Sequence, residues 1–223
     1  MRPCVIAVDG TAASGKGTLA RRLAAHFGFA HLDSGVLYRL TALGVLEAGG
    51  DPGSEADALA AARAIDHARA GDPRLRSDRV GAAASRLAAI AAVRAALLRY
   101  QRDFIAHPPG AAPGSVVDGR DIGTVICPDA DAKLFVDAAP EVRAHRRWQE
   151  LAGLGIARTE QQVLDELVNR DAADRARTVA PLRQAPDAAL LDTTNLGIDA
   201  AFAAALALVK PRLAAKLEAK PRG

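Results

Sequence analysis

Short apolar runs alternate with longer stretches of helical periodicity along this chain. The apolar runs that are typical of buried strands lie at residues 3–9, 29–32, 116–117, 133–136 and 189–191. The stretches with helical spacing lie at residues 16–27, 37–48, 55–71, 81–106, 141–151, 160–175 and 198–209. Short buried strands separated by helices indicate a parallel sheet with helices on both faces. The pattern therefore predicts an α/β fold of three layers around a central five-stranded parallel sheet.

The composition agrees with one globular domain. The 223 residues are 50% hydrophobic and 25% charged, and the net charge is only +3. Aromatic residues make up 4% and no run of Lys and Arg stands out, which argues against a nucleic-acid polymer as partner. Cys4 and Cys127 lie far apart without a metal-binding pattern, and the apolar run at residues 4–8 is too short for a membrane span. We therefore expect a cytoplasmic protein that binds no membrane.

A glycine-rich segment lies between the first expected strand and the first expected helix. It consists of Gly10, Thr11, Ala12, Ala13, Ser14, Gly15, Lys16, Gly17 and Thr18, with the spacing G-x4-G-K-x-[ST]. Glycines let the backbone curl with its N–H groups turned inward, and the following helix places its positive end at the same point. Lys16 adds a mobile positive charge. In this context the segment predicts an ATP phosphate-binding loop (P-loop) rather than a tight turn with a solvated lysine.

The metal-binding hydroxyl of such loops is displaced by one position. The residue after Lys16 is Gly17, and the first hydroxyl comes at Thr18. We therefore assign no direct metal ligand and expect Mg²⁺ to be held with ATP by the phosphates, with Thr18 contributing through water. A GTPase is not indicated, because no N-K-x-D guanine-binding motif occurs in a suitable place.

Four further polar segments follow in order along the chain. They are residues 33–39 (DSGVLYR), Ser85 with Arg94, residues 118–124 (DGRDIGT) and residues 169–177 (NRDAADRAR). Taken singly, each has a simple structural explanation, such as a helix cap at Ser34 or a solvated helix face with i,i+4 ion pairs in the last segment.

Taken together, these segments resemble bacterial cytidylate kinase, a P-loop family among the nucleoside monophosphate kinases. The resemblance extends from Val5 to Thr193, nearly the whole chain. It implies that the loop binds ATP and that Lys16, Arg120 and Arg170 are catalytic. The residues that it implies for CMP binding are Ser34, Arg39, Ser85, Arg94, Arg120, Asp121, Arg170, Asp174 and Arg177.

The resemblance also implies which part of CMP each residue contacts. Arg39 and Arg120 would bind the phosphate, and Arg170 and Asp174 the sugar. The residues implied to read cytosine are Ser85, Arg94, Asp121 and Arg177. The chemistry of Asp121 fits this role, because a carboxylate accepts from the amino group of cytosine and repels the carbonyl oxygen that uracil has there.

The implied reaction is transfer of the ATP γ-phosphoryl group to CMP or dCMP. The acceptor oxygen is already ionised, so positioning and charge neutralisation by Mg²⁺, Lys16 and the arginines are sufficient. Residues 1–223 would form a single kinase domain with a substrate-binding lobe at about 34–100 and a small mobile lid at about 146–177. Arg170, Asp174 and Arg177 have the spacing i, i+4, i+7 and would share one face if their helix extends that far.

The chain departs from the family pattern in the lobe. Cytidylate kinases of bacteria typically carry an inserted small antiparallel sheet there, whereas this interval is short and Ala-rich, and only residues 75–80 could form a remaining strand. We expect a trimmed, more helical lobe. The lid lacks the four-cysteine pattern of zinc-bearing adenylate kinases, so no structural metal is expected.

Two alternatives stay open at this point. One is a related small-molecule kinase that accepts UMP, AMP or shikimate, and the other is a non-catalytic ATP-binding protein. Asp121 after Arg120 favours CMP, and retention of Lys16 with the arginines favours catalysis. The expected partners are therefore ATP and CMP or dCMP, and we expect a monomer.

Overall fold

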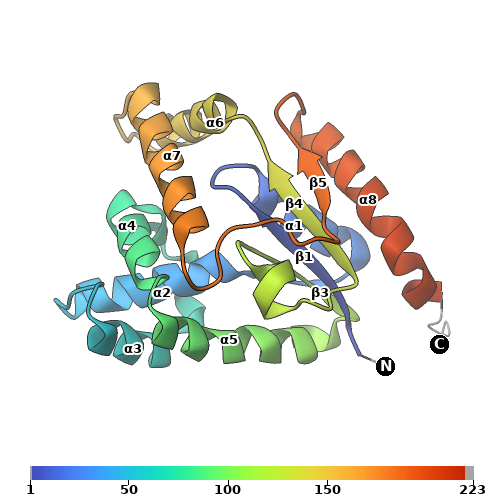
Figure 1. Cartoon of the computed structure of the whole chain (residues 1–223), viewed down its shortest axis with the longest axis horizontal. Coiled ribbons are helices and arrows are strands. Elements are labelled where there is room, and N and C mark those ends of the chain that lie inside the picture. The colour runs from blue at the N-terminus through green and yellow to red at the C-terminus, as the bar shows by residue number, and fades with distance from the viewer. Residues whose placement is uncertain (1, 219–223) are drawn as a thin grey trace. The chain divides into compact units, whose positions relative to one another are not determined.

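A five-stranded sheet forms the centre of the computed structural model, which describes residues 2–218 (Figure 1). Its strands are β1 (Cys4–Gly10), β2 (Ala30–Asp33), β3 (Gly114–Gly119), β4 (Ala132–Asp137) and β5 (Ala189–Asp192). The spatial order is β2-β3-β1-β4-β5, and β1 runs parallel to β3 and β4, as β4 does to β5. The predicted α/β class with a central five-stranded parallel sheet is confirmed.

The chain divides into two compact units. Unit 1 comprises Met1–His31 and Ile105–Gly223, and unit 2 comprises Leu32–Phe104. The helical elements of unit 1 are α1 (Lys16–Phe27), η3 (Pro109–Ala111), η4 (Ile122–Ile126), α6 (Pro140–Gly153), α7 (Glu160–Ala176) and α8 (Ile198–Glu218). Those of unit 2 are α2 (Ser34–Glu47), α3 (Glu55–Arg63), η1 (His67–Gly71), η2 (Pro73–Arg76), α4 (Asp78–Leu87) and most of α5 (Ala91–Ala106).

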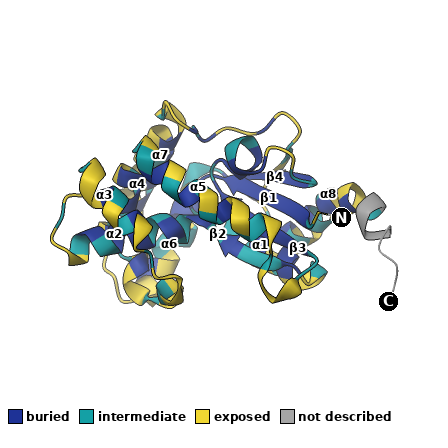
Figure 2. Cartoon of the chain, turned by 90° about the horizontal axis from the view of Figure 1, so that it is seen from below, coloured by how far each residue is buried: buried dark blue, intermediate teal, exposed yellow. Residues whose placement is uncertain are grey.

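The core of unit 1 lies between the sheet and two helices. Alternate residues of β1, among them Ile6 and Val8, point to one face, where Leu23 of α1 and Ala205 of α8 pack against them. All four are fully buried. Figure 2 shows β1 and β4 as buried strands. This packing fixes the end of β1, from which the glycine-rich loop leaves the sheet.

Unit 2 consists of short helices around a core of its own. Leu37 of α2, Leu87 of α4 and Val93 of α5 are buried together in it. Small alanine side chains fill many of the remaining core positions, which lets the short helices approach each other closely. The range expected for the substrate-binding lobe, residues 34–100, falls within this unit.

Residues 75–80, the one stretch of the lobe that could have formed a remaining strand, are helical apart from Ser77. Residues 73–76 form η2, and α4 begins at Asp78, because the side chain of Ser77 caps it by accepting from the N–H of Val80. Leu75 and Val80 are buried in the helical core rather than in a sheet. The helical character expected for the lobe is therefore more complete than the sequence suggested.

Three predicted helices differ from the structure by more than a few residues. The stretch 55–71 is helical only to Arg63 and resumes as a 3-10 turn at His67, and the stretch 81–106 is broken at residues 88–90 into α4 and α5. The last helix continues past Pro211, because Leu213 is fully buried in the core of unit 1. Tertiary packing overrides local propensity at this point.

Over the described residues, no single helix has the length and apolar character needed to cross a bilayer. Only the pair 78–87 and 91–111, bent by 100°, reaches that length and composition when the two pieces are added together.

Candidate active site

The glycine-rich loop connects the end of β1 to the start of α1. Gly10 has a φ of +155°, and a Cβ atom there would lie 2.0 Å from the carbonyl oxygen of Val136 on the neighbouring strand β4. Gly15, which precedes α1, has a φ of +84°, a conformation that favours glycine. These two glycines turn the chain sharply, so that the first N–H groups of α1 face back into the loop.

The lysine of the loop folds back over it. Lys16 Nζ lies 3.3 Å from the carbonyl oxygen of Thr11 and donates to it. The hydroxyl of Ser14 donates to the same carbonyl oxygen at 3.0 Å. The positive end of α1 and the Lys16 ammonium group therefore both lie at residues 11–16, as phosphate binding requires.

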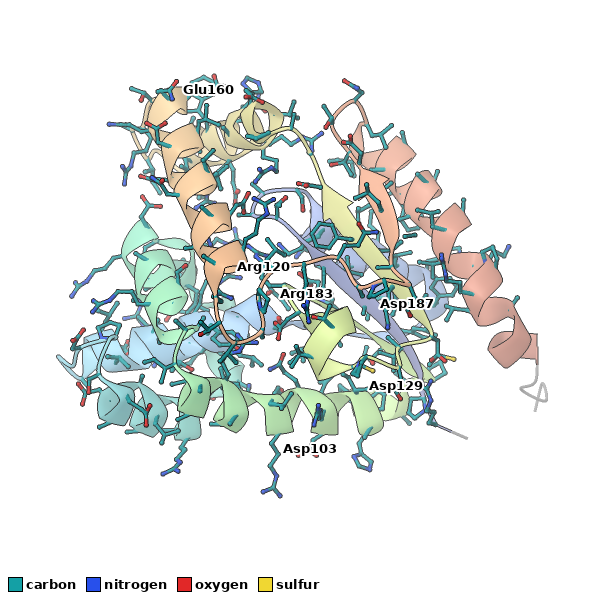
Figure 3. All side chains as sticks on the ribbon, viewed as in Figure 1. Asp103, Arg120, Asp129, Glu160, Arg183 and Asp187 are labelled. Carbon is teal, nitrogen blue, oxygen red and sulfur yellow. The ribbon has the colours of Figure 1, made fainter. Side chains whose placement is uncertain are left out.

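A second charged cluster joins residues that are distant in sequence. Arg120 follows β3, and its Nε donates to Asp174 Oδ2 on α7 at 2.8 Å (Figure 3). Arg177 donates to the other oxygen of the same carboxylate. Burial raises the pKa of Asp174, but Arg120, Arg177 and Arg170 outweigh burial and hold that pKa below its usual range. Asp174 is therefore an anion that orients two arginines, in addition to any contact with a sugar.

Arg177 does not extend the helix. Helix α7 ends at Ala176, and Arg177 has an extended backbone with φ −58° and ψ 134°. The expectation that Arg170, Asp174 and Arg177 share one helical face therefore holds only for the first two. Arg177 reaches Asp174 from the chain that leaves the helix.

Asp121 occupies the turn between β3 and η4. It is buried, and its carbonyl oxygen accepts from the N–H groups of Val125 and Ile126, which makes a single π-helical turn. The next two N–H groups, those of Ile122 and Gly123, donate to the Asp9 carboxylate at 2.7 Å each. Asp9 thus holds the turn that carries Asp121, a role that the sequence analysis missed.

The other four residues expected to bind CMP lie in unit 2. One of them is Arg39, which donates to the Asp33 carboxylate at 3.0 Å. Asp33 also caps α2 by accepting from the N–H of Val36. Arg94 of α5 is buried, with its guanidinium group 5.7 Å from the ring centre of Tyr38. The last two are Ser34, which begins α2 and is buried, and Ser85 of α4, which is half-buried.

Comparison with known sequences identifies the family to which this chain belongs. The sequence model described as "Cytidylate kinase" matches residues 6–211. The chain belongs to the cytidylate kinase family. The cytidylate kinase of Afipia carboxidovorans is 54% identical over 206 residues, 92% of this chain and 97% of that protein. That of Rhodospirillum rubrum is 55% identical over 202 residues, 91% of this chain and 95% of that protein. The resemblance inferred from the motifs is confirmed.

Solved structures agree with the fold of this family member. A gluconokinase from Sinorhizobium meliloti superposes with a TM-score of 0.51 at 12% identity over 98% of each chain. An uncharacterized protein from Eubacterium ventriosum superposes with a TM-score of 0.54 at 11% identity, covering 93% of this chain and 98% of that one. At these identities the likeness concerns the fold alone.

Asp118 is a further acidic residue close to the glycine-rich loop. It is buried at the end of β3, opposite Val8 of β1, and its Oδ1 lies 2.8 Å from His31 Nε2. A Cβ on Gly17 would lie 3.6 Å from its Oδ2, so the carboxylate borders the loop. The sequence showed Asp118 within a motif but gave it no role.

The oxygen donors beside the loop suit a magnesium ion. Mg²⁺ prefers carboxylate, hydroxyl and phosphate oxygens and keeps several waters. The Thr18 hydroxyl, which also accepts from Arg21 at 3.3 Å, and the Asp118 carboxylate lie next to Gly17. The described residues contain no group of three His, Cys, Asp or Glu side chains that could hold a metal by themselves. This donor set fits an ion that arrives with ATP.

Proposed function

We propose that this chain is an ATP-dependent cytidylate kinase that transfers the γ-phosphoryl group of ATP to CMP or dCMP. The observation that carries the proposal is that unit 1 combines a P-loop with a cluster in which Arg120 and Arg177 donate to the buried carboxylate of Asp174. Membership of the cytidylate kinase family over residues 6–211 supports the same reaction.

The P-loop is proposed as the ATP site. Its N–H groups and Lys16 would hold the ATP phosphates, because the loop turns at Gly10 and Gly15 toward the positive end of α1. Arg120 and Arg170 are proposed to neutralise the charge that spreads over the transferred phosphoryl group. Asp174 keeps the Arg120 guanidinium group in one orientation, so the charge is in place before reaction.

Nine residues are proposed to bind CMP. They are Ser34, Arg39, Ser85 and Arg94 in unit 2, and Arg120, Asp121, Arg170, Asp174 and Arg177 in unit 1. Buried Asp121 is proposed to select cytosine over uracil, because a uracil oxygen would face a buried carboxylate without a proton to share.

Mg²⁺ is proposed to bind with ATP next to Thr18 and Asp118. When bound, it supplies positive charge that neutralises the phosphates. The proposed lobe (residues 34–100), the proposed lid (residues 146–177), a monomeric state and a cytoplasmic location complete the proposal. The two free, buried cysteines, Cys4 and Cys127, support a reducing compartment.

A coupled assay of ADP release tests the proposal against its alternatives. CMP and dCMP should be turned over, while UMP, AMP and shikimate should react with a kcat/KM lower by roughly 100-fold or more. Turnover of UMP or AMP as fast as CMP would reassign the acceptor. Absence of ADP release with every acceptor would indicate a non-catalytic ATP-binding protein.

One variant links the activity to the charged cluster. Arg120→Ala should lower kcat/KM for CMP by roughly 100-fold or more, because the charge is lost at the transferred group. Arg99→Ala is the matched control, since its side chain is 89% exposed on α5. Equal activities of the two variants would contradict the assigned role of Arg120.

A further inference from the structure

A buried ion pair lies against the P-loop and has no part in the proposed substrate contacts. Arg143 Nη1 of α6 donates to Asp171 Oδ2 of α7 at 2.6 Å. The two side chains are 3% and 2% exposed, so the pair is shielded from water. Helices α6 and α7 pack side by side (Figure 1). The ion pair between them contacts Ala12, in the segment that follows β1.

Both polar backbone groups of one loop residue are bound by this pair. The N–H of Ala12 donates to Asp171 Oδ1 at 3.2 Å, and the carbonyl oxygen of Ala12 accepts from Arg143 Nη1 at 3.0 Å. A second donor of the same guanidinium group, Nε, bonds the carbonyl oxygen of Ala138 at 2.9 Å. The position of Ala12 is therefore set from the two helices and from the end of β4.

The next loop residue adopts a conformation that needs such support. Ala13 has a φ of +58°, which is unfavourable for a residue with a side chain. On its other side, the hydroxyl of Thr193 donates to the carbonyl oxygen of Ser14 at 3.1 Å, and Arg146 of α6 donates to that hydroxyl at 3.2 Å. Ala13 is thus held in its left-handed conformation by bonds to the residue before it and the residue after it.

Stability alone is a poor explanation for the Arg143–Asp171 pair. A buried ion pair often contributes no more to folding than apolar residues of the same volume, because both charges lose their hydration. The Arg143–Asp171 pair forms hydrogen bonds with the loop backbone. An apolar pair in its place would leave the N–H and C=O groups of Ala12 without partners. What the ion pair provides is one fixed loop conformation.

We propose that Arg143 and Asp171 are positioning residues of the phosphate donor site: they fix the Ala12 peptide, and so align the P-loop for ATP. Asp171 stands directly after Arg170 and three residues before Asp174 on α7. The helix that carries these proposed substrate contacts is thereby bonded to the donor loop. The proposal rests on the proposed function, since it assumes that the loop binds ATP.

Binding measurements on Asp171→Asn test the pair. When the single amide oxygen of Asn accepts from the Ala12 N–H, its NH₂ group faces Arg143, so the buried guanidinium group loses both an acceptor and its counter-charge. Affinity for a non-hydrolysable ATP analogue, measured by calorimetry without CMP, should fall at least 10-fold. Affinity for CMP should change less than threefold, and KM for ATP should rise in turnover assays.

Two further variants separate positioning from general damage. Glu166→Gln removes the charge of an exposed ion-pair partner on the same helix, which lies 3.0 Å from Arg158, and it should leave both affinities unchanged. Arg143→Lys keeps the charge but not the fork that bonds three oxygens, and it should weaken ATP binding about threefold or more while the protein stays folded. If Asp171→Asn fails to fold, the ATP affinity of Arg143→Lys tests the positioning role by itself.

The outcomes distinguish this proposal from the proposed function. If the unmodified protein does not bind the ATP analogue, the proposed function fails. If it binds the analogue and the folded Asp171→Asn or Arg143→Lys variant binds it equally well, only the positioning role is overturned. An equal loss of ATP and CMP affinity would also overturn it, because that result indicates general damage to unit 1.

Discussion

Gly10 is the residue at which the loop has no space for a side chain. In Gly10→Ala, the Cβ would lie 2.0 Å from the Val136 carbonyl oxygen, which belongs to the rigid backbone of β4. We predict a loss of unfolding free energy of about 3 kcal/mol, since β1 and β4 must separate. Gly153→Ala is the control: no atom lies within 4 Å of its added Cβ at the end of α6, so stability should stay equal or rise slightly. Urea unfolding midpoints compare the two, and equal midpoints would refute the prediction.

Residues of the site that stand in one contiguous motif were visible in the sequence. The loop from Gly10 to Thr18 is identified by its spacing, and Arg120 with Asp121 by the resemblance of their motif to that of the family. Asp9, Asp118 and Asp171 were not assigned, although the last two stand within quoted motifs. Their roles depend on partners such as Arg143, 28 residues from Asp171, or Ile122, 113 residues from Asp9. A single sequence does not show which distant backbone groups a carboxylate will meet.

The start of α7 depends on a capping box. The Thr159 hydroxyl accepts from the N–H of Gln162, and the Gln162 side chain accepts from the N–H of Thr159. We predict that Thr159→Ala lowers the unfolding free energy by about 1 kcal/mol, while Thr159→Ser keeps the wild-type value. Thermal unfolding of the three proteins measures this. A serine variant as unstable as the alanine variant would show that the methyl group, rather than the hydroxyl, matters.

Elements were predictable where burial pattern and local chemistry agree. The strand expected at 133–136 lies within β4, and the helix expected at 16–27 has the bounds of α1, because a glycine in the left-handed conformation stands at each of its ends. The helix bounds in the Ala-rich region of unit 2 were predicted less accurately. Alanine suits a helix on every face, so its periodicity reveals neither the break at 88–90 nor the end of α3 at Arg63. The possible strand at 75–80 does not form, since Leu75 and Val80 are buried between helices.

At the scale of the whole molecule, the family and the parallel sheet were predictable, and the lobe expected at residues 34–100 falls within unit 2, although its boundaries were not visible in the sequence. Five short apolar runs separated by helices imply the sheet, whereas its order, with β1 between β3 and β4, follows from tertiary pairing. The boundary of unit 2 at Leu32 falls inside β2 and leaves no linker signal in the sequence. The free energy of unfolding is a property of the whole molecule. The buried residue Asp9 makes a contribution to it that varies with pH.

Burial raises the pKa of Asp9 to about 7, although the N–H groups of Gly123 and Ile122 oppose the shift. In the unfolded chain the pKa of Asp9 has the ordinary value near 3.8. At a pH between these two values, Asp9 therefore keeps its proton in the folded protein and loses it in the unfolded chain. Between about pH 4 and pH 7 the unfolded state binds fewer protons, so this residue makes stability fall as pH rises, by up to about 4 kcal/mol, and above pH 7 its effect is constant.

The Asp9 contribution can be isolated by comparison with Asp9→Asn, which cannot titrate. The unfolding free energy of the wild type minus that of the variant should fall steadily from pH 4.5 to pH 7 and then level off. Subtraction removes the opposite contribution of Asp174, whose lowered pKa favours the folded state above the acid range. Urea titrations at half-unit pH intervals give both curves. A difference that stays flat through this window would mean that Asp9 is ionised in the folded protein, held by its two N–H donors alone.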